Sequence, residues 1–313
     1  MIMKQFQYIQ TNKTIRSPFF YVGDKYKLMP QLKRYFPKHI ETYIEPFVGG
    51  GSSFLNIQAQ NYILNDANSY IISLHKFLQD NAQNPHFIMQ LFSVIESYQL
   101  SCSLKNIIPP KELREAYKKT YFAKYNKESY LKLRHEFNAN KNDMLKLYIL
   151  LIYGFNRMIR FNSKGNFNLP VGNVDFNINV LNALKDYFAF MDKKKLTFFN
   201  LDYREFLTSI PLKQTDFIYL DPPYLISGSE YNKLWDEHLE TSLYILLNNL
   251  DSQGIRWGLS NLLRHKGKIN VFLEKFTEKY QTYIIKSNYI SFNDNSIKKD
   301  SLEVYVTNAQ QKA

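Results

Sequence analysis

The hydrophobic positions of this chain gather into short apolar runs near both ends, and these runs predict buried strands. Two runs lie early, at residues 43–47 and 62–64. The later runs lie at residues 196–201, 217–220, 255–261, 280–287 and 302–307, and the run at 255–261 reads as a strand that ends in a turn. Short apolar runs bounded by polar turns are typical of strands in a buried sheet. The pattern therefore predicts one α/β sheet assembled from two pieces of the chain.

From residue 71 to about residue 192 the pattern favours helices instead. They are predicted at residues 71–78, 85–98, 111–121, 128–138 and 143–153, with two further helices in the α/β pieces at 53–60 and 238–250. Lys and Arg are dense in the middle region. We therefore predict an α/β domain formed by residues 1–76 and 193–313, interrupted by a mainly helical domain at residues 77–192.

The strand predicted at 43–47 leads into a glycine-rich turn, residues 48–52, and the next strand ends at Asp66. Strand, glycine turn, helix, strand and acid follow one another in dinucleotide-binding half-folds, where the acid binds ribose hydroxyls. The glycine spacing is not G-x-G-x-x-G, and no phosphate-binding lysine follows. A nucleoside ligand without phosphates therefore fits better than NAD or ATP. A tight turn without a ligand and a helix N-cap at Asp66 are the competing structural interpretations.

The strand predicted at 217–220 ends in Asp221-Pro222-Pro223-Tyr224. In open α/β sheets, ligands bind beyond the carboxyl ends of the strands. The two prolines fix φ and remove two backbone donors, which leaves a corner rich in acceptors beside an aromatic ring. Such a corner suits a planar base whose amino group donates hydrogen bonds while its face stacks. A plain strand-ending turn is the alternative.

The charge of the chain indicates a polyanionic partner. The 313 residues carry a formal net charge of +12 and a pI of about 9.4, and they include 24 Tyr and 24 Phe. Nucleic acid is the first candidate for such a chain and an anionic membrane the second. In the Gly/Asn-rich segment 154–173, Arg157, Arg160 and Lys164 alternate with phenylalanines. That alternation favours a hairpin pressed against nucleic acid, although a basic surface hairpin over an aromatic cluster is equally compatible.

Several other kinds of site are not expected. With Cys102 as its single cysteine, the chain has no partner for an internal disulfide and no cysteine-based metal site. The six histidines show no ligand spacing, so no metal is expected. Residues 1–16 lack the apolar core of a signal peptide, and the longest apolar stretch, 147–155, is too short to span a bilayer. We expect a soluble cytoplasmic protein.

A series of motifs over nearly the whole chain resembles the α group of DNA adenine-N6 methyltransferases, the D12 class typified by the Dam and DpnII-type enzymes. The motifs are, in order, Ser17–Lys25, Glu45–Ser52, Asn65-Asp66, Tyr130–Asn138, Gly154–Pro170, Asp202-Tyr203, Asp221–Tyr224 and Leu259–Asn261. The resemblance implies a Rossmann-like, S-adenosylmethionine-dependent methyltransferase sheet. The inserted helical domain would recognise the target and carry a DNA-reading β-hairpin.

The resemblance also implies roles for individual residues. The catalytic motif is Asp221, Pro222, Pro223 and Tyr224. The residues that would hold S-adenosylmethionine are Tyr21, Gly23, Lys25, Phe47, Gly49, Gly51, Ser52, Asp66, Asp202, Tyr203 and Asp221. The residues that would contact double-stranded DNA are Phe155, Asn156, Arg157, Arg160, Asn162 and Lys164. Arg160 keeps the place of a base-contacting arginine, and Phe155 that of an intercalating aromatic.

These roles lead to a hypothesis for the mechanism. Asp221 and the Pro222 carbonyl would accept the two N–H bonds of adenine N6, which frees its lone pair to attack the methyl group of S-adenosylmethionine. The adenine would flip out of the duplex and stack on Tyr224. A monomer suffices to methylate one strand at a time. The enzyme would be solitary, phage-borne or paired functionally with a restriction endonuclease.

Two departures from the family leave the target sequence open. GATC-reading members carry a guanine-contacting lysine where this chain has Phe20, and their hairpins differ at residues 157–159. We therefore do not predict GATC. Cytosine-N4 methylation, RNA adenine methylation and DNA binding without catalysis are the alternative functions. Asp221 favours adenine over cytosine, because serine is more usual there in cytosine-N4 enzymes, and the hairpin with the helical insertion favours duplex DNA over RNA.

Overall fold

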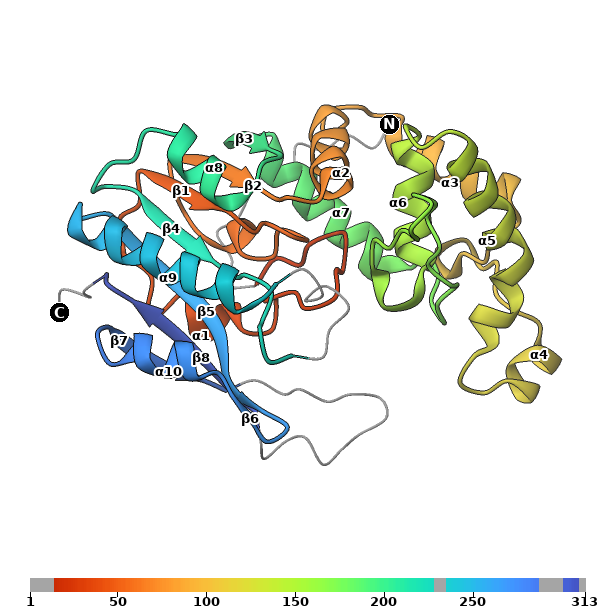
Figure 1. The fold of residues 1–313 in the computed structure, drawn as a ribbon. Coiled ribbons are helices and arrows are strands. Elements are labelled where there is room, and N and C mark those ends of the chain that lie inside the picture. The colour runs from red at the N-terminus through yellow and green to blue at the C-terminus, as the bar shows by residue number, and fades with distance from the viewer. Residues whose placement is uncertain (1–13, 228–234, 287–300, 310–313) are drawn as a thin grey trace. The chain divides into compact units, whose positions relative to one another are not determined.

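The structure is a computed structural model that describes residues 14–227, 235–286 and 301–309 (Figure 1). The chain forms two compact units. The helical unit contains residues 1–26, 49–55 and 68–194, and the sheet unit contains residues 27–48, 56–67 and 195–313. The functional domains predicted at 1–76 with 193–313 and at 77–192 stay predictions.

The sheet unit is built on one eight-stranded sheet in the order β3-β2-β1-β4-β5-β8-β7, with β6 paired to β5. The strands are β1 (Thr42–Glu45), β2 (Asn61–Asn65), β3 (Lys195–Phe199), β4 (Phe217–Leu220), β5 (Arg256–His265), β6 (Lys268–Ile269), β7 (Gln281–Ile285) and β8 (Leu302–Thr307). The first five in spatial order are parallel, and β8 is antiparallel to both β5 and β7. This topology confirms the predicted Rossmann-like α/β class.

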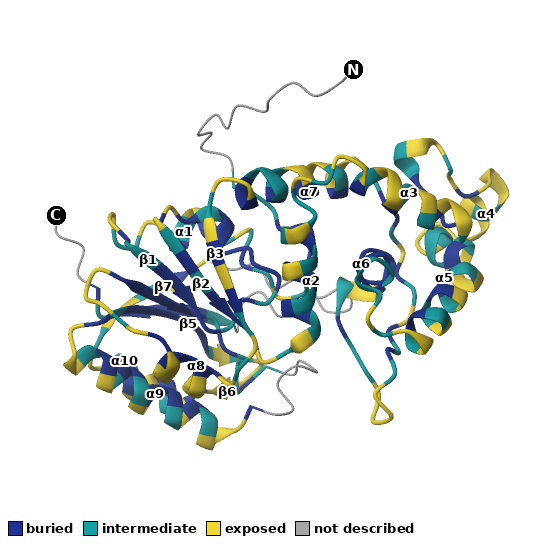
Figure 2. Cartoon of the chain, turned by 90° about the horizontal axis from the view of Figure 1, so that it is seen from above, coloured by how far each residue is buried: buried dark blue, intermediate teal, exposed yellow. Residues whose placement is uncertain are grey.

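Both faces of the sheet are buried at its centre. Helices α8 (Tyr203–Ser209), α9 (Glu237–Ser252) and α10 (Val271–Thr277) lie together on one face, where Ile218 and Leu220 of β4 enter their apolar cluster (Figure 2). On the other face the Phe36 ring lies 4.9 Å from that of Phe217 and 5.1 Å from that of Tyr219. Successive side chains of a strand point to opposite faces. Burial on both sides therefore explains why β4 reads as a continuous apolar run.

The helical unit is organised around a helix that is buried on all sides. Its helices are α2 (Ser69–Asp80), α3 (Phe87–Ser97), α4 (Lys111–Ala116), α5 (Tyr121–Ala139), α6 (Met144–Tyr153) and α7 (Ile178–Met191). Every residue of α6 from Leu147 to Tyr153 is buried, which accounts for the longest apolar stretch of the sequence. None of the helices in the described ranges is long and apolar enough to cross a membrane.

Several of the predicted elements differ in extent from those of the structure. The helix expected at 53–60 is only a 3₁₀ turn, Phe54–Asn56, because the Tyr62 hydroxyl holds the Ala59 amide and the Ile57 carbonyl in a turn that leads into β2. The helix expected at 111–121 ends at Ala116. A new helix, α5, begins at Tyr121, and the Asn173 side chain accepts hydrogen bonds from two amides of its first turn.

The strand at 255–261 does not turn after Asn261. It continues to His265, because β8 and then β6 pair with its second half. The strand predicted at 280–287 appears as β7 and ends at Ile285; residue 287 lies outside the described residues. Four helices were not predicted: α1 (Met29–Leu32), α7, α8 and α10. Three of these are of seven residues or fewer, too short to give a clear helical period.

Candidate active site and nucleic-acid interface

Two of the predicted site segments begin at neighbouring strand ends in the sheet unit. The chain leaves β1 for β2 and β3 on one side, and it returns to β4 and β5 on the other, so the strand order reverses between β1 and β4. These two strands pair in parallel, with Ile44 opposite Ile218. Phe47 follows the end of β1 and Asp221 follows the end of β4. Both therefore start at a topological switch point, where open α/β sheets bind ligands.

A pair of carboxylates shares one phenol at the end of β4. The Tyr224 hydroxyl donates to Asp221 Oδ1 at 2.9 Å and lies 3.1 Å from Glu303 Oε1. Glu303 lies on β8 and is fully buried. A carboxylate offers about four acceptor positions, so the bond from Tyr224 does not by itself prevent Asp221 from accepting further hydrogen bonds. Sequence reasoning missed Glu303, because no local pattern links it to Tyr224.

An aromatic cluster brings together two residues predicted to bind the cofactor. The Phe47 ring lies 5.3 Å from that of Tyr203 and 5.7 Å from that of Trp235. Tyr203 is almost fully buried, which raises the pKa of its hydroxyl to about 12. Sequence reasoning did not single out Trp235, whose indole N–H donates to Glu240. The cluster can serve as an apolar wall for a planar ligand.

The acids predicted beside the cofactor occupy turns of the sheet unit. Asp202 caps α8 by accepting from the Arg204 amide at 3.0 Å. Its carboxylate also pairs with the Arg204 guanidinium, and these hydrogen bonds lower the pKa of Asp202. Asp66 follows β2, and its backbone carbonyl accepts from the Asn200 amide group at 2.8 Å. Asp66 is not a helix N-cap, because Asn68 caps α2.

The first motif and the glycine turn meet in the helical unit. The Ser17 hydroxyl donates to the Gly50 carbonyl. A Cβ placed on Gly50 would lie 2.6 Å from Tyr21 Cβ, and one on Gly51, where φ is +80°, would lie 2.4 Å from Phe54 Cε1. Glycine is therefore required for this close approach. The structure thus brings Tyr21 together with the turn that holds Gly49 and Gly51.

The remaining cofactor predictions also fall in this part of the helical unit. Gly23 has a left-handed backbone, with φ of +76°, in the loop that follows Tyr21. Lys25 and Ser52 are both buried, at 7% and 4% exposure. Burial of a lysine and a serine fits a polar ligand site. Their roles towards a cofactor stay predictions.

The buried His75 ring links the glycine turn to α7. Its Nε2 lies 2.8 Å from the Gly49 carbonyl and its Nδ1 lies 2.7 Å from the Tyr187 hydroxyl. A carbonyl can only accept, so Nε2 carries the proton and Nδ1 accepts from Tyr187. The ring is fully buried, and this burial lowers the pKa of His75 to about 4.

The buried His75 predicts an acid-sensitive helical unit. An unfolded histidine binds a proton near pH 6.5, whereas folded His75 does so only near pH 4. Stability is therefore complete above pH 6.5 and is lost as the pH falls towards 4. We expect His75 to account for roughly 2 kcal/mol of destabilisation between pH 7 and pH 5, measured by chemical denaturation. His75→Gln, which can keep both hydrogen bonds, should flatten that dependence, whereas exposed His135→Gln should leave it unchanged.

The segment 154–173 forms the predicted hairpin. Gly154 pairs with Val171 and Phe161 with Phe167, both antiparallel. The hairpin is fixed to α5 by Asn138, whose side chain bonds both the amide and the carbonyl of Phe167. A Cβ on Gly172 would lie 2.7 Å from the Gly154 carbonyl oxygen, so the two arms approach as closely as backbones can.

The six residues predicted to contact DNA differ in exposure. Phe155, Asn156, Asn162 and Lys164 are exposed, and Phe155 exposes 52% of its surface. Arg160 is partly buried, and its guanidinium donates twice to Asn168 within the hairpin, at 3.0 Å each. Arg157 is also partly buried, with its guanidinium carbon 4.4 Å from the centre of the Phe20 ring. The hairpin thus presents aromatic, amide and basic groups to solvent.

Comparison with known families gives this geometry a context. The sequence model of D12 class N6 adenine-specific DNA methyltransferases matches residues 21–294. The chain belongs to this family. Among the described residues, no group of three or more His, Cys, Asp or Glu side chains is placed to hold a metal ion.

Individual relatives of this methyltransferase family member are modification and adenine methylases. The chain is 33% identical to the modification methylase StsI of Streptococcus sanguinis and 31% identical to the type II methyltransferase M.FokI of Planomicrobium okeanokoites. Each match covers 96% of this chain and 44% of the relative, so the chain spans less than half the length of these relatives. It is also 30% identical to the DNA adenine methylase of Vibrio cholerae, over 65% of this chain and 63% of that protein.

One solved structure aligns with this family member along most of its length. The rRNA methyltransferase aviRa from Streptomyces viridochromogenes aligns over 94% of this chain and 93% of its own, with 9% identity and a TM-score of 0.36. A score this low carries no argument about function, and the fold is established by the strand order of the sheet unit.

Proposed function

We propose that this chain is a site-specific DNA methyltransferase that transfers a methyl group from S-adenosylmethionine to N6 of a flipped adenine in duplex DNA. The observation that carries the proposal is the position of Asp221-Pro222-Pro223-Tyr224 at the end of β4, at the switch point of a sheet whose chain belongs to an N6 adenine-specific family. Acceptors there can take hydrogen bonds from an exocyclic amino group.

The protein residues act by orientation and charge. Asp221 and the Pro222 carbonyl accept hydrogen bonds from the two N–H groups of N6. These bonds draw the nitrogen towards a tetrahedral shape and stabilise the positive charge that develops on it. Tyr224 stacks on the flipped base. S-adenosylmethionine, when bound, supplies the electrophilic methyl group. Tyr21, Gly23, Lys25, Phe47, Gly49, Gly51, Ser52, Asp66, Asp202 and Tyr203 are the residues proposed to hold it.

The hairpin is proposed to read the DNA. Exposed Phe155 is suited to insert between bases and Arg160 to contact a base edge, and basic Lys164 lies at the hairpin tip. We further propose that the chain works as a monomer in the cytoplasm and is functionally paired with a restriction endonuclease. The relatives named modification methylases support that pairing.

Expression in a methylation-free host tests the proposal. Modification-sensitive long-read sequencing of the host DNA should find N6-methyladenine at one short motif, which also names the target. An unmodified genome in the presence of folded protein would contradict the proposal. A radiolabelled methyl-transfer assay on RNA would then distinguish an RNA substrate from DNA binding without catalysis.

Glu303 gives a sharper test of the site geometry. Glu303→Gln keeps an acceptor for the Tyr224 hydroxyl but removes its charge, so the phenol is held less firmly. We expect kcat to fall roughly tenfold, which corresponds to about 1.4 kcal/mol, with KM for DNA unchanged. Steady-state kinetics on an oligonucleotide duplex measures both values. Equal activity of the variant and the unaltered protein would remove Glu303 from the site.

A further inference from the structure

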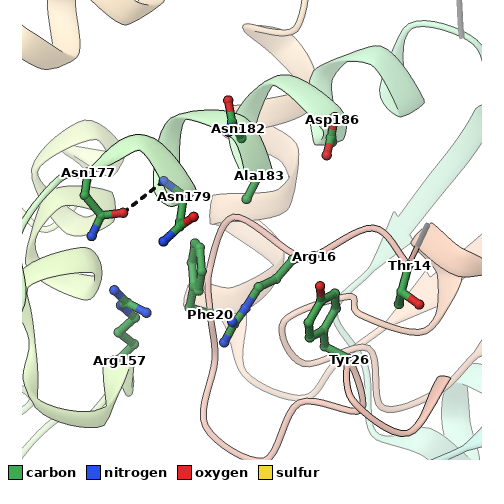
Figure 3. A pocket seen from close by; sticks show the side chains of 10 residues that line it. All are labelled: Thr14, Arg16, Phe20, Tyr26, Arg157, Asn177, Asn179, Asn182, Ala183 and Asp186. Carbon is green, nitrogen blue, oxygen red and sulfur yellow. Dashed lines mark hydrogen bonds between the residues drawn. The ribbon is translucent and has the colours of Figure 1, made fainter. Parts of the chain in front are cut away.

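A cavity lies entirely within the helical unit. It encloses about 360 Å³ and is bounded by residues of the segment 14–26, by the start of the hairpin and by the first turns of α7 (Figure 3). This volume is within the range of small-molecule sites. None of the residues predicted to bind S-adenosylmethionine lines it. The ligand of this cavity is therefore considered separately from S-adenosylmethionine.

Two arginines and two aromatic rings alternate along this cavity. The guanidinium carbons of Arg157 and Arg16 each lie 4.4 Å from the centre of the Phe20 ring, and that of Arg16 lies 5.0 Å from the centre of the Tyr26 ring. Figure 3 shows the Phe20 ring between the two guanidiniums. Stacking on an aromatic face orients a guanidinium and leaves its N–H edge to bind a ligand.

Nearby acids compensate the two cations only in part. Within residues 14–227, 235–286 and 301–309, neither Arg16 nor Arg157 forms an ion pair, and the buried Nε of Arg16 has no hydrogen-bond acceptor. Burial, and then the nearby charge of Arg16, lower the pKa of Arg157 to about 10, although the nearby Asp175 and Asp24 act in the opposite direction. Asp186 lines the same cavity, on α7. Two like charges on the wall of one cavity favour an anion within reach of both.

The backbone at the cavity is held in unusual conformations. Phe20, Asn156 and Arg157 all have a positive φ, of +48°, +53° and +49°. This region costs free energy for residues other than glycine, and such residues cluster at ligand sites, where the surrounding structure holds them in place. The strained residues lie on both segments that carry the stacked Phe20 and Arg157. The unusual backbone conformations therefore occur where these two side chains contact each other.

The start of α7 adds a weaker contribution of the same sign. Asn177 caps this helix of 14 residues, and its side chain accepts from the Asn179 and Val180 amides. Asn177, Asn179 and Asn182 also line the cavity. A helix N-terminus carries a partial positive charge, and amide groups can donate to phosphate oxygens.

We propose that this cavity binds a phosphate group, held by Arg16 and Arg157 and supplied by the backbone of the DNA substrate. Guanidinium forks match phosphate oxygens in geometry and charge. This inference rests on the proposed DNA methyltransferase function. A phosphate contact positions a protein on DNA without reading its sequence. Arg157 would thus hold the start of the hairpin against the DNA backbone, while exposed hairpin residues contact the nucleobases.

The salt dependence of DNA binding tests this proposal. Binding of a random duplex and of the target duplex is measured from 50 to 200 mM salt for the full chain, Arg16→Gln, Arg157→Gln and Asn182→Asp. Each arginine variant should lose roughly threefold to tenfold in affinity, equally on both duplexes, and its log–log salt slope should be smaller by about 1. Asn182 is exposed, so its aspartate tests charge at the cavity without altering the stack; it should weaken binding similarly.

Controls separate this proposal from folding and from the proposed function. Lys185→Gln removes one exposed positive charge from α7 outside the cavity and should leave both the affinity and the slope nearly unchanged. Thermal unfolding of each variant reports on folding. Methyl transfer and S-adenosylmethionine binding by the unaltered protein test the proposed function independently of any slope.

The outcomes are distinct. A slope that is unchanged in both Arg16→Gln and Asn182→Asp overturns the DNA assignment. If millimolar inorganic phosphate then raises the Tm of the unaltered protein but not of Arg16→Gln, the phosphate comes from a small molecule instead. If neither effect appears, the phosphate site itself is wrong. A loss confined to the target duplex would also overturn it, because it would indicate a base contact.

Discussion

Replacing Asp221 with alanine is expected to reduce methyl transfer by about 10²–10³-fold, because the variant loses the charged group proposed to accept from adenine N6 at the end of β4. The Tyr224 hydroxyl would also lose its 2.9 Å bond to Asp221, so the phenol would shift as well. Single-turnover transfer of a radiolabelled methyl group to a duplex oligonucleotide measures the loss. DNA binding should remain largely intact.

Two comparisons make the Asp221 result specific. Asp192→Ala removes an exposed aspartate at the end of α7 and should leave transfer unchanged. Tyr224→Phe removes the hydroxyl but keeps the ring, so it should impair transfer less than Asp221→Ala. Full activity of Asp221→Ala would exclude this residue from catalysis and would indicate that another group accepts the hydrogen bond from adenine N6.

Replacing Gly258 with alanine is expected to give the largest loss of stability. Gly258 is the third residue of β5, and an added Cβ would sit 2.0 Å from the Tyr305 hydroxyl oxygen and 2.5 Å from its Cζ. Tyr305 is fully buried on β8 and packs against Phe36, with ring centres 5.5 Å apart, so its ring has no room to move. Overpacking a core costs about 3 kcal/mol or more in such a case.

Thermal unfolding followed by circular dichroism should show this cost. A reduction in Tm of roughly 5–10 °C is expected for Gly258→Ala. Gly267→Ala is the matched control, because a Cβ there meets no atom within 4 Å and only its positive φ, +74°, is unfavourable. Its cost should be about 1 kcal/mol. Equal effects of the two substitutions would show that the Tyr305 ring can yield.

Local sequence pattern was enough to predict seven of the eight strands that the structure describes, and the position of the proposed catalytic motif after one of them. The run at 217–220 is apolar throughout because β4 is buried on both faces, and Asp221 follows it directly. Strand identity depends on local pattern and on the burial that the pattern encodes. The hairpin at 154–173 was also predictable, since it forms between residues that lie close in sequence.

Short helices and the breaks between helices were less accessible. The end of α4 and the start of α5 depend on Asn173, whose side chain lies about fifty residues further along the chain. No pattern within residues 111–121 could predict these hydrogen bonds. Likewise, β5 continues past Asn261 only because β8 and β6 pair with it.

The tertiary structure alone decided which polar groups meet. Glu303 reaches Tyr224 across 79 residues of sequence because β8 inserts between β5 and β7. Arg157 lies on the same phenylalanine as Arg16 although the sequence placed it only in a hairpin. Periodicity fixes which face of an element is buried, but strand order, register and side-chain direction fix the neighbours across that face. Contacts of this kind are set by the assembled chain as a whole.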